Sequence, residues 1–202
     1  MNRSTAPSGL TRAALMRRAA AAAGAAAGGA AVLAVAAAPG ESKPSAAQDK
    51  KILAAALVLE DLQAAFYARA LRDAGLSGEQ REFARTVGDH ERAHAAFIRK
   101  ALGADAKPPP KFDFGETTAD AHSFATAAQQ LEDVGLAVLN GQGPNLTPAT
   151  LAAAAKIVSV EARHASWIRD ISGAVPAPAA VDVGLSVKEG LARVRAMGIV
   201  IS

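Results

Sequence analysis

Cysteine is absent from the 202-residue sequence, and aromatic residues make up only 4% of it. The lack of cysteine excludes a disulfide framework, a thiolate zinc site, a catalytic thiol and a lipid-anchoring cysteine. Long runs of β-branched residues are also scarce, whereas alanine is abundant and 50% of the residues are hydrophobic. This composition favours an all-α protein.

The body of the chain has little net charge. The formal charge is +3, but residues 1–38 contain Arg3, Arg12, Arg17 and Arg18 and no acidic residue. Without these four, 18 of the 22 basic residues remain against 19 acidic ones, which leaves a net charge of −1. A nearly neutral body gives no electrostatic reason to expect a nucleic-acid partner.

The N-terminal segment has the layout of an export signal. Residues 1–18 are polar and basic and end in the pair Arg17-Arg18, and residues 19–38 are an unbroken run of Ala, Gly, Val and Leu. This order is typical of a signal peptide, and the arginine pair with a mildly apolar run resembles a twin-arginine (Tat) signal. We expect residues 1–38 to direct export to the periplasm, cell envelope or medium, with Sec as the alternative route. Cleavage would leave no membrane span, whereas an uncleaved signal could act as an anchor.

Four long helical segments follow a linker at residues 39–46. Glycine, proline and capping residues place them at about 46–74, 78–102, 119–140 and 147–171. Short connections make the first two helices one antiparallel hairpin and the last two another. The connection at about residues 104–118 contains three prolines, and extended it could reach roughly 50 Å, enough to run the length of a bundle.

The predicted bundle occupies residues 47–174, and a tail at residues 175–202 follows it. Ser186 and Glu189 have the spacing of a capping box, which predicts a short helix in the tail. We expect the tail to pack on the bundle, and contact with a second copy in a homodimer is the alternative.

Each long helix has a core-facing line of residues spaced alternately three and four apart, and each line contains one glutamate. Two lines also contain a histidine three residues after the glutamate, which places both side chains on one helix face. No lysine or arginine lies on these lines, so the buried carboxylates need another source of positive charge. Two divalent cations would balance four carboxylates, and carboxylate oxygen and imidazole nitrogen are suitable ligands. The predicted metal ligands are Glu60, Glu91, His94, Glu132, Glu161 and His164.

The stretches LEDLQAAFY, HERAHAAF, LEDVGLAVLNG and EARHASWIR contain these four glutamates, and FDF lies in the long connection. In the order of its ligands and in these stretches, the chain resembles ferritin-like di-iron and di-manganese carboxylate proteins. These stretches also resemble the exported branch that includes desiccation-related proteins. The resemblance implies a ferritin-like four-helix bundle with a long crossover between helices 2 and 3. It also implies a cofactor of two iron ions, with manganese as the alternative.

Four further residues have a predicted role beside an alternative. Tyr67 follows Glu60 by one helical repeat and could hydrogen-bond a ligand or relay an electron, or be a core residue. Asp61 and Asp133 could orient the histidines or lie on the surface. Gly135 could leave room for dioxygen or peroxide, or allow close helix packing. His90 and His122 fall outside the core-facing lines and are predicted to be ordinary surface residues.

The leading hypothesis is an exported dinuclear metal protein that oxidises Fe(II) or consumes peroxide or dioxygen in stress protection. Its partner would then be a small oxidant, and the protein an oxidoreductase of the ferroxidase or peroxidase type. The alternative is a non-enzymatic desiccation- or stress-related bundle in which the metal is structural, sequestered or lost. Carboxylate and imidazole ligands accept both iron and manganese, so the ligand set leaves the metal open.

Overall fold

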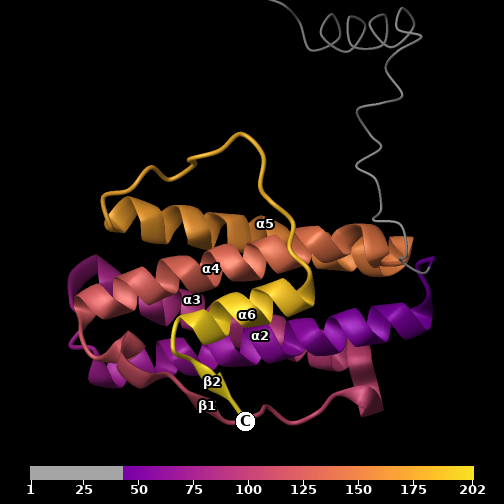
Figure 1. Ribbon diagram of the computed structural model, residues 1–202, viewed down its shortest axis with the longest axis horizontal. Helices are drawn as coiled ribbons and strands as arrows, with labels where there is room; N and C mark the ends of the chain where they lie inside the picture. Colours follow the sequence, from indigo (N-terminus) through magenta and orange to yellow (C-terminus); the bar gives the residue numbers. More distant parts are fainter. Residues whose placement is uncertain (1–42) are drawn as a thin grey trace, which may run out of the picture. The chain divides into compact units, whose positions relative to one another are not determined.

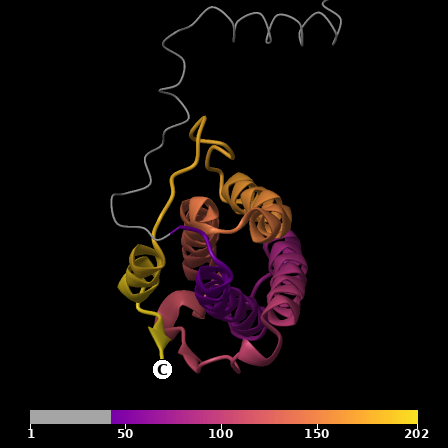
Figure 2. The same ribbon diagram turned by 90° about the vertical axis from the view of Figure 1, so that its right-hand side faces the viewer.

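The computed structural model describes residues 43–202, and the predicted export signal at residues 1–38 lies outside the described residues. Four long α-helices form the body of the described part (Figure 1). In the end-on view of Figure 2 they lie side by side around a common interior. This arrangement confirms the prediction of an all-α bundle. The four helices are α2 (Ala46–Asp73), α3 (Gly78–Leu102), α4 (Ala121–Gln142) and α5 (Pro148–Ile171).

The helix ends follow the local sequence closely. The hydroxyl of Ser45 accepts a hydrogen bond from the backbone N–H of Gln48 at the start of α2. Asp120 caps α4 in the same way, so this helix begins two residues later than the sequence suggested. Ser77 precedes α3, but its side chain makes no capping hydrogen bond. Side-chain acceptors at a helix start replace a missing backbone partner.

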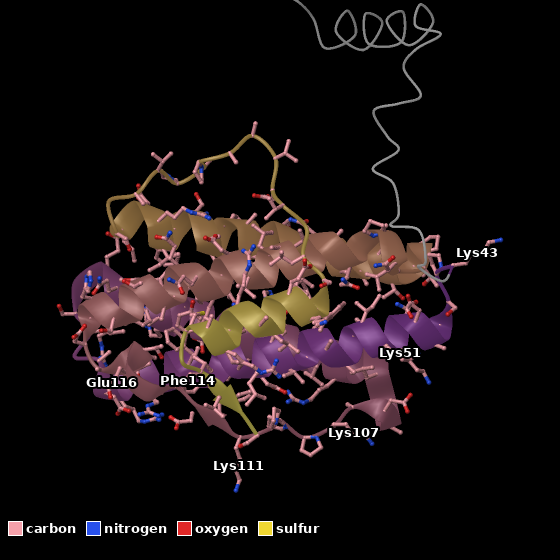
Figure 3. The ribbon with its side chains drawn as sticks, viewed as in Figure 1. Lys43, Lys51, Lys107, Lys111, Phe114 and Glu116 are labelled. Carbon is pink, nitrogen blue, oxygen red and sulfur yellow. The ribbon has the colours of Figure 1, made fainter. Side chains whose placement is uncertain are left out.

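The two hairpins are joined by an irregular crossover that runs beneath α2 in Figure 1. It contains the short 3-10 helices η2 (Gly103–Asp105) and η3 (Gly115–Thr118) and the two-residue strand β1 (Phe112–Asp113). Phe114 is buried between these elements and the bundle, whereas Lys111 points outward (Figure 3). The crossover is therefore attached to the bundle through its apolar residues.

The C-terminal tail packs against α4 and pairs with the crossover. The helix α6 (Val187–Ala196) begins with the predicted capping box, formed by Ser186 and Glu189. The strand β2 (Val200–Ile201) then pairs antiparallel with β1. A methyl group on Gly190 would lie 2.3 Å from the side chain of Val138, so glycine is needed where α6 meets α4.

The core lies on both sides of α2. One side carries Glu60 and Tyr67, as the spacing predicted. The other side buries Leu62 and Phe66, and it is covered by α4, the crossover and the tail. Phe66 stacks on Phe124 with ring centroids 5.7 Å apart. The helix α2 is therefore buried on two faces.

None of the helices in residues 43–202 contains an apolar stretch long enough to cross a bilayer.

Candidate metal centre

All six predicted ligands converge in the interior of the bundle. Each long helix contributes one glutamate, and α3 and α5 each add the histidine one turn later. The four glutamates and His164 are buried, and the side chain of His94 is only 11% exposed. Their ligand atoms form two groups, and within each group all atoms lie within 4.8 Å of one another. The first group is Glu60, Glu91, His94 and Glu161, and the second is Glu91, Glu132, Glu161 and His164.

His94 lies in the first group with its Nδ1 atom toward three carboxylates. Nδ1 is 3.3 Å from Oε2 of Glu60, 3.3 Å from Oε2 of Glu91 and 3.1 Å from Oε1 of Glu161. The three acids come from three different helices. These distances place the imidazole nitrogen and three carboxylate oxygens around one small space.

His164 occupies the matching place in the second group. Its Nδ1 atom is 3.1 Å from Oε1 of Glu91 and 3.3 Å from Oε2 of Glu132. Oε1 of Glu161 is farther, at 3.9 Å. Glu91 and Glu161 therefore belong to both groups, and Glu91 turns one oxygen toward each histidine. This is the arrangement that two neighbouring cations sharing carboxylates require.

Most of the inward-facing atoms lack a hydrogen-bond partner. These atoms are Oε2 of Glu60, Oε1 of Glu91, Oε2 of Glu132, both oxygens of Glu161 and Nδ1 of His164. A buried polar atom without a partner carries a free-energy cost of about 1–3 kcal/mol, and more when charged. Cation binding would satisfy all of these atoms at once. Carboxylate oxygen with imidazole nitrogen is a donor set that suits iron or manganese.

The charges of the cluster are strongly coupled. Burial alone would lower the pKa of His94, but its contacts with Glu161, Glu60 and Glu91 outweigh burial and raise the pKa to about 12. The pKa of His164 rises to about 10, because its contacts with Glu132 and Glu91 likewise outweigh burial. Both imidazoles are therefore protonated at neutral pH when no cation is present.

Burial and neighbouring charges shift the pKa values of the four carboxyl groups in different directions. Burial would raise the pKa of Glu91, but contacts with His164 and His94 lower it to about 2. Burial and the charge of Glu91 raise the pKa of Glu161 to about 8. Burial also raises the pKa of Glu60 and of Glu132. Without cations, two imidazolium charges and protons retained on the carboxyl groups with raised pKa values thus compensate the negative charge of the cluster.

Tyr67 lies beside the centre rather than in a separate part of the core. Its hydroxyl donates a hydrogen bond to Oε1 of Glu132, and Nε2 of Gln63 donates to the same oxygen at 3.1 Å. Oε2 of Glu132 is left facing His164. Two residues of α2 thus hold a carboxylate of α4 in one orientation.

Asp61 and Asp133 pair with arginines and form no hydrogen bond with a histidine in the described part of the chain. Both oxygens of Asp61 accept from Nη2 of Arg99 at 2.6 Å. Oδ1 of Asp133 accepts a hydrogen bond from Nη2 of Arg169. The first pair joins α2 to α3, and the second joins α4 to α5. The role of orienting histidines predicted for these aspartates is therefore corrected to one of joining helices.

The space beside Gly135 is filled by ligand and support side chains. A methyl group on this residue would lie 3.2 Å from Oε1 of Gln63 and 3.3 Å from Oε2 of Glu161. The glycine thus makes room for these two groups, so the open passage for a small molecule predicted here is corrected to a close packing contact.

A pocket of about 380 Å³ does reach the centre, but between α3 and α5. Its lining includes both histidine ligands together with His90, Val160 and Trp167. Nδ1 of His90 lies 2.9 Å from Nε2 of His164, and the two rings stack. The contact of His90 with His164 was not predicted, because His90 lies outside the core-facing line of α3. Its position directly before Glu91 is the one signal that could have indicated it.

Residues 48–174 match a protein-family model described as a ferritin-like domain. The match covers more than half of the chain and contains all six residues that meet in the interior. A comparison with curated proteins finds no match. The matched residues span α2 to α5 and end before α6, so they coincide with the part of the chain that supplies the cluster.

Proposed function

The chain belongs to the family of ferritin-like domains, and on this basis we propose that its buried cluster binds two metal ions in a redox centre. One observation carries the proposal: four carboxylates and two imidazoles surround a common space with most of their inward-facing atoms unpartnered. Glu60 and His94 would complete one position, and Glu132 and His164 the other. Glu91 and Glu161 would belong to both.

The reaction that we propose is oxidation of Fe(II) with consumption of dioxygen or peroxide, in protection against stress. Two neighbouring iron ions can each supply one electron to a two-electron reduction of such an oxidant. The ligand set supports this class because four carboxylates stabilise the more highly charged oxidised metal. Manganese would fit the same donors.

The residues around the ligands suit a small, neutral oxidant. The pocket between α3 and α5 ends at His94 and His164, and Trp167 forms part of its wall. A pocket of about 380 Å³ admits a diatomic molecule or peroxide easily. Tyr67 donates a hydrogen bond to Glu132, and in this proposal its buried phenol passes an electron to the centre.

A second candidate is a non-enzymatic stress- or desiccation-related bundle with a structural, sequestered or vestigial metal site. The contacts of His94 and His164 with the carboxylates favour it, because protonated imidazoles offset part of the negative charge without any metal. Such a bundle could fold metal-free.

We also propose export through the Tat route, with Sec as the alternative, on the N-terminal sequence pattern alone. The Arg17-Arg18 pair is the testable element. Replacing both arginines by lysine should leave the protein in the cytoplasm if Tat carries it. Export that persists unchanged would point to Sec.

Anaerobic iron loading of the purified chain tests the function. We expect two Fe(II) ions per chain and a fast oxidation phase when air is admitted. Both should be lost in Glu91→Ala and retained in Glu82→Gln, a matched control on the exposed face of α3. Two bound ions without oxidation would favour the second candidate with a structural or sequestered metal. No bound ion would overturn the metal centre.

A further inference from the structure

The two halves of the candidate centre repeat the same pattern. In α3 the ligands are Glu91 and His94, and in α5 they are Glu161 and His164. The halves differ at the residue directly before each glutamate. This residue is His90 in α3 and Val160 in α5, and both line the pocket between these helices.

His90 contacts the ligand of the opposite helix. Its Nδ1 atom is 2.9 Å from Nε2 of His164, and the ring centroids are 5.1 Å apart with an interplanar angle of 18°. Nδ1 of His164 is the atom that faces the carboxylates. A cation bound there takes the lone pair of Nδ1, so the ring proton must be on Nε2, which then donates to His90. A hydrogen-bond acceptor at the outer nitrogen fixes the ring and its tautomer and strengthens the inner nitrogen as a ligand.

His94 has no equivalent support. Its polar contacts in residues 43–202 all involve Nδ1 and the carboxylates, and its ring stacks on that of His164. Val160, which corresponds to His90, is apolar and offers no acceptor. The outer nitrogen of His94 is therefore without a protein acceptor in the described part of the chain.

The half of the centre that contains His164 has additional support at its carboxylate Glu132. Tyr67 and Gln63 both donate to Oε1 of Glu132. Both glutamates have an unpartnered Oε2 atom, but within residues 43–202 no side chain outside the ligand set donates a hydrogen bond to Glu60. Three polar groups outside the ligand set thus act on Glu132 and His164, whereas corresponding groups for Glu60 and His94 are absent from residues 43–202.

We propose that His90 is a positioning residue that fixes His164 for metal binding and makes the two metal positions unequal. The position of Glu91, Glu132, Glu161 and His164 binds a divalent cation more tightly and fills first. The position completed by Glu60 and His94 fills second. This inference rests on the proposed dinuclear centre and concerns affinity, so it can be tested without turnover.

Titration of the purified chain with Co(II) provides the test, because the visible bands of cobalt report its coordination and calorimetry gives both affinities. We expect two separate steps. His90→Leu should weaken the tighter step by about 10- to 100-fold, as expected for a lost partner of a ligating histidine, and leave the weaker step unchanged. His90→Gln should recover part of the loss, because the amide oxygen can accept the hydrogen bond.

The repeat of the pattern supplies a matched pair of variants. Val160→His should introduce an acceptor for His94 and tighten the weaker step, whereas Val160→Leu should change neither step. His90 is exposed, so its replacement is expected to leave the fold intact, and circular dichroism checks this. His90→Ala repeats the test without adding apolar bulk.

Two results would overturn the inference in different ways. If the unaltered chain binds two cobalt ions and the His90 variants change neither affinity, the positioning role is wrong and the dinuclear centre stands. If the unaltered chain binds no cobalt, both the inference and the metal centre fail. Equal weakening of both steps would show a general loss of structure and would contradict a role confined to His164.

Discussion

Glu91 of α3 and His164 of α5 meet across the interior of the bundle, with Oε1 of the glutamate 3.1 Å from Nδ1 of the histidine. The other oxygen of Glu91 lies 3.3 Å from Nδ1 of His94. One carboxylate thus touches the nitrogen ligands of both halves. Of the two histidine ligands, Glu60 contacts only His94.

Removing a shared ligand should therefore cost more than removing an unshared one. We expect Glu91→Gln to abolish binding at both positions and Glu60→Gln to leave one ion per chain. Metal analysis after gel filtration measures the stoichiometry. Glu82→Gln is the control, since this side chain is 62% exposed and among residues 43–202 pairs only with Arg85. Equal stoichiometry in the two variants at positions 60 and 91 would contradict the sharing of Glu91.

Metal affinity should rise steeply with pH. The pKa values of about 12 for His94 and about 10 for His164 mean that both nitrogens carry a proton at neutral pH. A cation binds only after these protons leave, so each proton released makes the apparent affinity about tenfold higher per pH unit. Titrations with Co(II) between about pH 6 and about pH 8 measure this slope. A flat profile would mean that the imidazoles do not bind the metal through Nδ1.

Tyr67→Phe should separate the hydrogen bond to Glu132 from the packing of the ring. The phenyl ring fills the same buried space, but Glu132 keeps only the donor Gln63. We expect the free energy of unfolding in urea to fall by about 1–3 kcal/mol while two ions still bind. Loss of one ion would show instead that the hydroxyl is needed to hold Glu132 as a ligand.

Gly135→Ala should lower metal affinity even though alanine is the better helix former by about 1 kcal/mol. The new methyl group would press on Gln63 and Glu161, whose oxygens lie 3.2 and 3.3 Å from its position. Gly190→Ala is the control. The three atoms nearest to its methyl group belong to Val138 and Val134, which are not part of the centre, so it should reduce stability without displacing a ligand. Unchanged cobalt affinity in Gly135→Ala would mean that these side chains move aside at no cost.

Asp49 should make the free energy of unfolding depend on pH independently of the metal centre. It accepts from the backbone of Thr147 at 2.9 Å and from the hydroxyls of Thr147 and Thr150 at 2.5 and 2.6 Å, so α2 caps the start of α5. Burial would raise its pKa, but these hydrogen bonds lower it below the ordinary value of 3.8. The stabilisation is therefore present above about pH 4 and is lost as pH falls through the depressed pKa.

Asp49→Asn should then reduce the free energy of unfolding by about 1–2 kcal/mol at neutral pH. The difference from the unaltered chain should shrink as pH falls through the depressed pKa of Asp49, because the aspartate then becomes protonated itself. Urea unfolding at several pH values measures both. A difference that stays constant into the acid range would show that the carboxylate charge is not what stabilises the contact.

The bundle and its cluster were predictable because their signals are local. The alternating spacing places Glu60 and Tyr67 on one face of a single helix, and capping residues such as Ser186 mark where helices begin. Both ends of α4 were predicted two residues too early, and the helix continues through Gly141 to Gln142. A side chain at Gly141 would collide with the backbone of Leu185, so this glycine serves tail packing and does not end the helix.

The missed features depend on contacts between distant residues. His90 gains its role from His164, and Asp61 finds Arg99, each on another helix. The second buried face of α2, with Phe66 at its centre, is covered by residues from the crossover and the tail. Spacing within one helix carries no information about such partners, because it reports only which side chains share a face.

The contacts within each helical hairpin differ in kind from the contacts between the two hairpins at the centre. Each has its own aspartate–arginine pair, such as that of Asp61 with Arg99, which joins α2 to α3. The contact of His94 with Glu161 instead runs from one hairpin to the other. A pair of cations in this place would act as a cross-link between two separately stabilised halves. Its removal would loosen the join between the hairpins before it loosened either hairpin itself.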